Sequence, residues 1–215
     1  MTDNFDIIKY LMGVEDDKDI FFHLQIIRRG KDHPNLPAAN KTIQTWLVHG
    51  TEHLDKLRDE IVFLCEHYQA RAYINITPKR MADLNTLLLY KVAENINNHN
   101  VVNPYKVLNS AIGLLQGTEK RWIVDIDSND SVYILCVKLM IDSVWLKAHP
   151  EDWGKSRESG WLIAQIPTQS GVHLLTRPFN LKEFKERYPD IDVHKNNPTI
   201  LYIPKSLDNK SEYIF

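Results

Sequence analysis

The sequence predicts an α+β protein, and three observations lead to this fold class. Short runs rich in β-branched and aromatic residues alternate with longer stretches whose apolar residues recur at helical spacing. The chain has 215 residues, of which 43% are hydrophobic and 25% charged, as in globular proteins that bury one or two adjoining cores. No repeat, low-complexity tract or flexible linker is visible. Two packed subdomains, 1–120 and 121–215, are therefore expected.

The first part, residues 1–120, is expected to be an α/β subdomain. Hydrophobic periodicity predicts strands at 20–27, 43–48 and 70–76 and helices at 51–68, 84–96 and 104–115. Thr51 is a suitable N-cap for the first helix, and Gly117 is a plausible stop for the last. Thr77-Pro78 is expected to end the third strand, because proline cannot donate to a strand ladder.

The second part, residues 121–215, has a clearer pattern. Strands are predicted at 121–127, 161–166, 172–177 and 199–203, and helices from Asn129 or Asp130 to just before Pro150 and from Asn180 to about Tyr188. This order is strand, helix, strand, strand, helix, strand, the βαββαβ arrangement of the ferredoxin-like and RNA-recognition-motif-like (RRM-like) folds. In that fold the first strand lies centrally, between the third and the fourth.

Bulk properties exclude several classes of protein. The formal net charge is −2, which argues against coating nucleic acid by charge alone, although the run 28–31 (Arg-Arg-Gly-Lys) is either a solvated loop or a phosphate-contacting loop. No apolar stretch approaches the ~20 residues that span a bilayer, and the first residues lack a secretory pattern. Cys65 and Cys136 stand apart and are expected to be buried thiols. No membrane association and a cytoplasmic location are expected.

Two carboxylates end the predicted strand 121–127, at Asp125 and Asp127. Because alternate strand residues point to the same face, these like charges lie side by side. Such a pair is unfavourable unless a cation offsets it, and a divalent cation with oxygen ligands is the usual partner. A D-x-D pair is often only an exposed surface feature, but its place on a central strand favours a metal site.

Ser170, Gly171 and His173 lie at the start of the predicted strand 172–177, beside the acidic strand. Ser170 and His173 supply hydrogen-bond donors suited to phosphate oxygens, and Gly171 would let a ligand approach the backbone. A lone strand histidine is usually structural, but the adjacent carboxylates favour a role in binding.

A third carboxylate is expected just before the fourth strand, where either Asp190 or Asp192 could reach a metal. Asp192 is favoured because it follows the apolar Ile191 and lies nearer the last strand. Asp190 follows Pro189, which is typical of a turn.

Together these residues resemble the archaeo-eukaryotic primase superfamily, which includes phage and plasmid primase-polymerases. The resemblance covers roughly residues 60–204. An apolar strand ending in D-x-D corresponds to 123–127, a small-x-His motif to 171–173, and an apolar-Asp motif to 191–192. Upstream, 72–80 (Ala-Tyr-Ile-Asn-Ile-Thr-Pro-Lys-Arg) is similar to the strand and basic turn of phage and plasmid members.

The resemblance implies templated addition of nucleotides to a nucleic acid 3′ end, or primer synthesis de novo. The implied ligands of Mg²⁺ or Mn²⁺ are Asp125, Asp127 and Asp192. The implied nucleotide or template contacts are Ser170, Gly171, His173, Lys195, Arg80 and Lys79. Lys195 stands where relatives often have arginine. The implied partners are a template and primer, nucleoside triphosphates, and a separate helicase or accessory protein.

Two other functions stay open from the sequence alone. One is a catalytically inactive RRM-like module that binds nucleic acid or nucleotide, although such sheets usually present stacking aromatic residues where this one offers acids and a histidine. The other is a metal-dependent nuclease that uses the same carboxylates.

Overall fold

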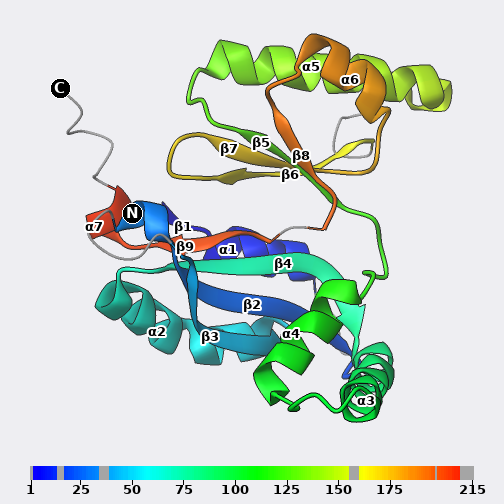
Figure 1. Cartoon of the computed structure of the whole chain (residues 1–215). Coiled ribbons are helices and arrows are strands. Elements are labelled where there is room, and N and C mark those ends of the chain that lie inside the picture. The colour runs from blue at the N-terminus through cyan, green and yellow to red at the C-terminus, as the bar shows by residue number, and fades with distance from the viewer. Residues whose placement is uncertain (1, 14–16, 34–38, 155–159, 197, 209–215) are drawn as a thin grey trace.

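The computed structural model describes residues 2–13, 17–33, 39–154, 160–196 and 198–208. Two sheets, both antiparallel, and the helices that cover them make an α+β structure, so the predicted fold class is confirmed at that level (Figure 1). Among these residues, no helix combines the length and apolarity that crossing a membrane requires.

The five-stranded sheet is built mainly from the first half of the chain. Its strands, in spatial order, are β1 (Thr2–Asp3), β9 (Thr199–Ile203), β4 (Arg71–Arg80), β2 (Ile20–Arg28) and β3 (Lys41–Val48). Helices α1 (Phe5–Met12) and α2 (Thr51–Tyr68) cover one face of it. Alternate residues of β2, such as Leu24 and Ile26, are fully buried under these helices, as strand alternation requires.

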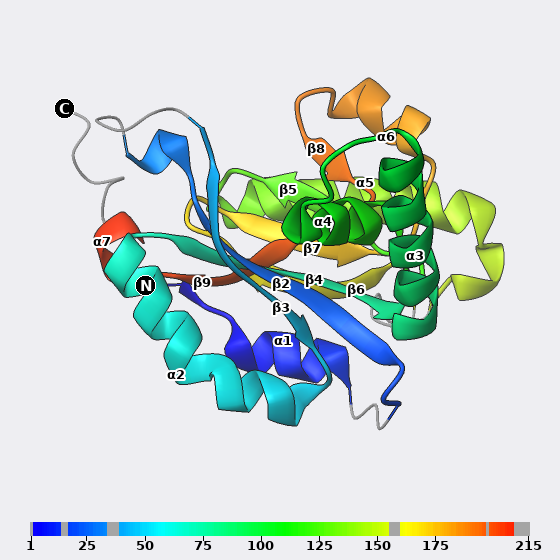
Figure 2. The same ribbon diagram turned by 60° about the horizontal axis from the view of Figure 1, so that its bottom comes forward.

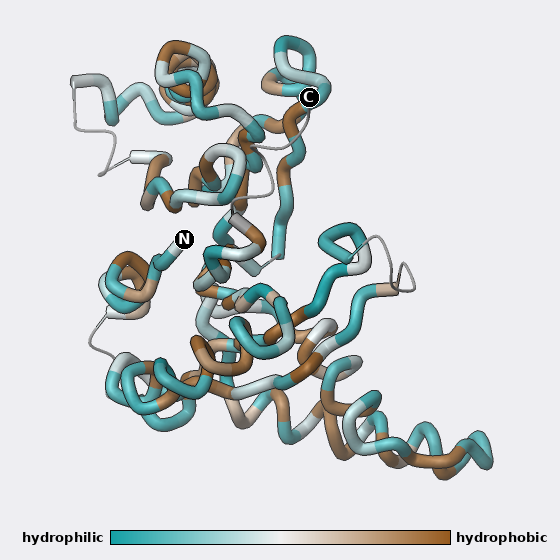
Figure 3. The backbone as a smooth tube through the Cα atoms, turned by 90° about the vertical axis from the view of Figure 1, so that its left-hand side faces the viewer, coloured by the Kyte–Doolittle hydropathy of each residue, from teal (hydrophilic) through white to brown (hydrophobic). Residues whose placement is uncertain are grey.

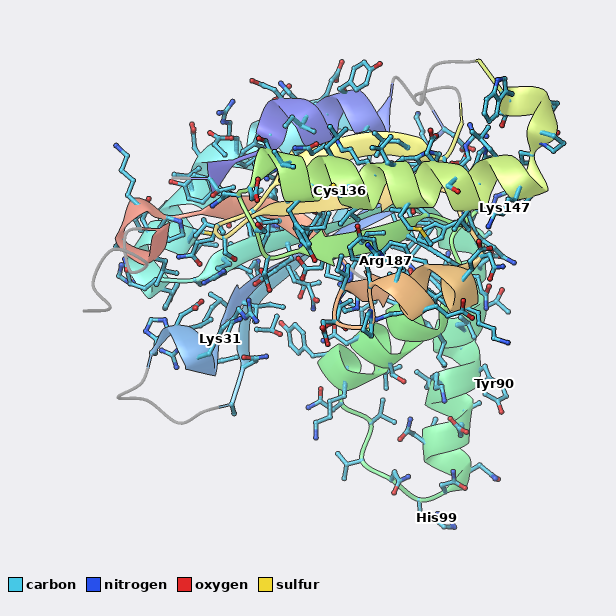
Figure 4. The ribbon with its side chains drawn as sticks, turned by 90° about the horizontal axis from the view of Figure 1, so that it is seen from above. Lys31, Tyr90, His99, Cys136, Lys147 and Arg187 are labelled. Atoms are coloured by element: carbon cyan, nitrogen blue, oxygen red, sulfur yellow. The ribbon has the colours of Figure 1, made fainter. Side chains whose placement is uncertain are left out.

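A helical hairpin projects from the end of this sheet. It consists of α3 (Met81–Asn97) and α4 (Pro104–Leu114), and only its base joins a core, through Leu84, Ala111 and Ile112. Figure 3 shows apolar and polar residues alternating along the projecting part, and Figure 4 labels Tyr90 and His99 on it. A short 3-10 turn, η1 (Gly30–Asp32), follows β2.

The four-stranded sheet comes from the second half. Its strands, in spatial order, are β6 (Leu162–Pro167), β7 (Val172–Thr176), β5 (Trp122–Ile126) and β8 (Asp192–His194). Its helical cover is α5 (Ser131–Ala148), which continues into the 3-10 turn η2 (Pro150–Asp152), and α6 (Leu181–Arg187). A last short helix, α7 (Lys205–Asp208), follows β9.

The two sheets face each other, with helices on both outer sides (Figures 1 and 2). On β5, Val124 and Ile126 pack in the cluster formed with α5 and α6, whereas Ile123 packs in the cluster of the five-stranded sheet. Asp125 shares the face of Ile123 because side chains alternate along a strand. Asp125 therefore points into the space between the sheets.

The prediction for the fourth strand of the second half was wrong. Residues Thr199–Ile203 do form a strand, β9, but it pairs with β1 and β4 in the five-stranded sheet. The strand beside β5 is the shorter β8, Asp192–His194. The five-stranded sheet thus draws one strand from beyond residue 120.

Three predicted boundaries also shift. Strand β4 continues through Thr77-Pro78 to Arg80, because the register between β2 and β4 shifts at this point and the missing proline N–H breaks no ladder bond. Thr51 is the first residue of α2 rather than its cap, which is Gly50. Helix α4 ends at Leu114, before Gly117.

Candidate active site

Asp125 and Asp127 lie at the end of β5, in the centre of the four-stranded sheet. In the antiparallel ladders, Asp125 lies opposite His173 of β7 on one side and opposite Asp192 of β8 on the other. Residues directly opposite each other share a face, with their Cβ atoms about 5 Å apart. Three short elements therefore bring the predicted acids and the histidine together.

His173 joins the two sheets through its two ring nitrogens. Nε2 lies 3.3 Å from Oδ1 of Asp125, and Nδ1 lies 2.8 Å from the hydroxyl of Thr199 on β9. Nε2–H donates to the carboxylate of Asp125, which can only accept, and Nδ1 shares a hydrogen bond with the hydroxyl of Thr199. The hydrogen bond from His173 lowers the pKa of Asp125 against the opposing effect of burial, and the charges of His173, His194 and Lys31 lower it further.

Ser170 holds the second acid, since its hydroxyl donates to Oδ1 of Asp127 at 2.9 Å. Gly171, next in the chain, lies tightly against β5. A Cβ added there would be 1.9 Å from the carbonyl oxygen of Ile126 and 2.6 Å from the amide nitrogen of Ser128. The space that Gly171 was expected to leave for a ligand is therefore filled by the backbone of β5, and the glycine serves strand packing.

Asp190 and Asp192 both line a small pocket of about 170 Å³, which they share with Asp125, Asp127 and Tyr133. Asp192 is exposed and begins β8, opposite Asp125, whereas Asp190 belongs to the turn before the strand. The strand pairing holds Asp192 beside Asp125, and because Asp190 lines the same pocket, the choice between them as third ligand stays a prediction.

These carboxylates fit a divalent cation in their chemistry, because they offer hard oxygen donors from adjacent strands on one face. The ligand atoms of Asp125, Asp127 and Asp192 do not all lie within 4.8 Å of one another; within the described ranges, His149, Glu151 and Asp152 form the one group that does. The three aspartates are therefore neighbours with suitable donor atoms, but in this structure they do not form a closed set of metal ligands.

A larger pocket, the inter-sheet pocket, opens in front of the acids and measures about 370 Å³. Asp125, Asp127 and His173 line it from the four-stranded sheet. Arg29, Lys31 and Arg71 line it from the five-stranded sheet and the η1 turn, where Figure 4 labels Lys31. The run 28–31 thus places two of its cations across the pocket from the acids.

Arg71 is a buried member of this wall, with 7% of its surface exposed. Its guanidinium makes two 2.7 Å bonds to the carboxylate of Asp32 and a 2.8 Å bond to the side chain of Gln169. Gln169 in turn donates to the carbonyl of Leu207. This network ties the η1 turn and β4 to the β6–β7 turn that carries Ser170.

Three predicted contact residues lie elsewhere. Lys79 is 1% exposed, its ammonium donates to the carbonyl of Leu115 at 2.7 Å, and burial lowers its pKa, so it presents nothing to a ligand. Arg80 is exposed, but it lies nine residues along β4 from Arg71, about 30 Å away. Lys195 lines a different pocket.

The sequence did not single out Arg71, Tyr73, Asn40 or Thr199, although all four contact the site or line the inter-sheet pocket. Arg71 and Tyr73 alternate along β4 with the core residues Ala72 and Ile74, a pattern that marks a strand face but carries no motif. Their role depends on how the sheets face each other, which local periodicity does not encode.

No protein-family model matches the sequence, and no curated protein or solved structure matches the chain. The motifs and the geometry of the site are what support a function.

Proposed function

We propose that this chain is a metal-dependent nucleotidyltransferase of the primase-polymerase type. The observation that carries the proposal is the inter-sheet pocket, which sets Asp125 and Asp127 against Arg29 and Lys31. A nucleoside triphosphate bound with a divalent metal needs both kinds of side chain. Carboxylates hold the metal, and cationic side chains hold the phosphate oxygens.

The finer fold assignment belongs to the same proposal. The four-stranded sheet with α5 and α6 is proposed to be an RRM-like module. Its antiparallel order, β6-β7-β5-β8, supports this, because the first strand of the unit lies between the third and the fourth.

In the proposed reaction, Asp125, Asp127 and Asp192 hold Mg²⁺ or Mn²⁺, which when bound activates a 3′-hydroxyl and stabilises the leaving pyrophosphate. We propose a task for two of the remaining side chains from their hydrogen bonds. His173 orients Asp125 and Ser170 orients Asp127, since each donates to that carboxylate. Both were expected to hold the triphosphate, and we propose that Arg29 and Lys31 hold it instead, because they line the pocket opposite the acids.

The proposed partners are a template with its primer and nucleoside triphosphates, with a separate helicase or accessory protein as a further candidate. A cytoplasmic location is proposed with them, since these substrates are found there. The product could be DNA or RNA.

A primer-extension assay tests the function. Labelled primer-template is incubated with dNTPs or NTPs and Mn²⁺ or Mg²⁺, with and without primer. The wild type is expected to lengthen the primer, and Asp125→Asn to lose more than about 100-fold in rate, because even the groups that support a metal ligand matter 10–100-fold. Asp59→Asn, an exposed aspartate of α2, is the matched control and should keep full activity.

The product separates this function from its rivals. A metal-dependent nuclease would shorten the primer. An inactive module that binds nucleic acid or nucleotide would leave the primer unchanged, even where ligand binding raises its melting temperature. Full incorporation by a pure, folded Asp125→Asn protein would sink the assignment.

A further inference from the structure

A second pocket, separate from the inter-sheet pocket, has a lining suited to a polyanion. It measures about 390 Å³ and lies between the end of α4, the start of β5 and the end of β8. We call it the α4–β5 pocket. Its charged and aromatic lining consists of Glu119, Lys120, Trp122 and Lys195, and its amide side chains are those of Gln116 and Asn196.

The net charge available at this pocket is positive. Arg121 binds the carboxylate of Glu119 through two nitrogens, at 2.8 and 3.1 Å, and so neutralises it. Lys120 and Lys195 are exposed, and neither forms an ion pair with any residue that the structure describes. Two ammonium groups are therefore free to meet an anion.

Lys195 lies beside an aromatic ring of this pocket. Its ammonium lies 5.2 Å from the centre of the Trp122 ring, a cation–π contact, and Phe179 packs edge-on against that ring at 5.5 Å. A ring face attracts the ammonium but accepts none of its three N–H donors in an ordinary hydrogen bond. The donors stay available for phosphate oxygens.

The pocket also lies at a useful distance from the acids. Trp122 precedes Asp125 by three residues on the same strand, which is about 10 Å. Stacked nucleotides rise about 3.4 Å each, so about three of them cover that length. Because side chains alternate along a strand, Trp122 packs on the α5 and α6 side of the sheet and Asp125 on the other, so a strand held at Lys120 and Lys195 reaches the carboxylates around the open edge of β8.

Resting on the proposed function, we propose that the α4–β5 pocket binds the single-stranded template, with Lys120 and Lys195 on its phosphates. An unpaired strand is favoured over a duplex because the pocket offers amide groups from Gln116 and Asn196, which can meet base edges only where these are not paired. Lys195 thus contacts the template rather than the incoming nucleotide.

The test measures oligonucleotide binding by fluorescence anisotropy in the presence of a chelator, so that metal binding by the carboxylates makes no contribution. Binding of a labelled single-stranded oligonucleotide is followed across a salt series for the wild type and for Lys120→Gln/Lys195→Gln. The double variant should bind several-fold more weakly, and its slope of log affinity against log salt should fall by about 1.4, or about 0.7 per phosphate contact. Lys56→Gln/Lys205→Gln removes two exposed lysines elsewhere and should keep the wild-type slope.

Primer extension and nucleotide affinity are measured on the same proteins. If the wild type extends primers but the double variant binds the oligonucleotide like the control, the template site is wrong and the proposed function stands. If the double variant loses affinity for Mn²⁺ and nucleotide instead, the pocket is a nucleotide site and the inference is wrong. If the wild type extends no primer, the proposed function fails and the inference fails with it.

Discussion

At the scale of single residues, His173 shows what a sequence can and cannot predict. Strand alternation and the βαββαβ order were enough to place His173 beside Asp125, and the ladder has these residues directly opposite. The second partner, Thr199, lies on a strand of the other sheet. No local pattern links the two, because their contact depends on how the sheets face each other.

His23 is a second histidine with a measurable consequence. It lies on β2, and its Nε2 is buried without a hydrogen-bond partner among the described residues. Burial lowers its pKa to about 4, and the charge of Lys79 adds to the effect. Between pH 6.5 and about 4, the His23 ring is protonated in the unfolded chain but stays neutral in the folded chain. The free energy of unfolding should therefore be highest above pH 6.5. It should decrease as the pH drops from 6.5 toward 4, by up to about 3 kcal/mol.

The measurement is the free energy of unfolding in urea between pH 7 and pH 4. His23→Gln has no titrating ring and should lose less stability over this interval than the wild type. His67→Gln, an exposed histidine of α2, should follow the wild-type curve. Parallel curves for His23→Gln and the wild type would refute the assignment.

At the scale of elements, most helices and strands were predicted, whereas α1, β1, β8 and α7 were not. The apolar stripe of α5 and the alternation of β5 and β7 appear where periodicity placed them. Strand β8 has only three residues, Asp-Val-His, so no period can be recognised in it. It was consequently missed, although it carries one of the predicted metal ligands, Asp192.

The sequence left the cap of α5 open between Asn129 and Asp130, and the structure assigns it to Asp130. Its carboxylate accepts a 2.8 Å hydrogen bond from the amide of Val132. Asp130→Ala should therefore lower the free energy of unfolding by about 1 kcal/mol, the usual loss for a cap. Asn129→Ala, at the neighbouring exposed position, should change it by less than about 0.5 kcal/mol. Equal losses in urea denaturation would contradict the capping role.

At the scale of the whole molecule, the sequence predicted an α/β part and an RRM-like part, and it assigned β9 to the wrong one of the two. All five of its residues are buried, so they fit a central strand of either sheet equally well. The pairing with β1 and β4 is a long-range choice. This pairing also shapes the inter-sheet pocket, because Ile200 of β9 lines the pocket and Thr199 bonds His173 beside it.

A fragment of residues 1–120 should consequently fail to fold by itself. It lacks Leu201 and Tyr202 from the core, leaves one edge of β4 unpaired and gives β1 no partner. We expect no cooperative thermal transition by near-ultraviolet circular dichroism, whereas residues 1–208 should retain one. A sharp transition in the shorter fragment would show that β9 is dispensable for the sheet.

The return of the chain at β9 also orders events during protein synthesis. The cationic wall of the inter-sheet pocket, Arg29 to Arg71, leaves the ribosome well before the acids, yet its sheet stays incomplete until Ile203 has emerged. Until then β4 exposes an open edge to other nascent chains. An mRNA truncated before the Ile203 codon would yield a protein that contains every predicted metal ligand. Its five-stranded sheet, which forms the cationic side of the inter-sheet pocket, would be incomplete.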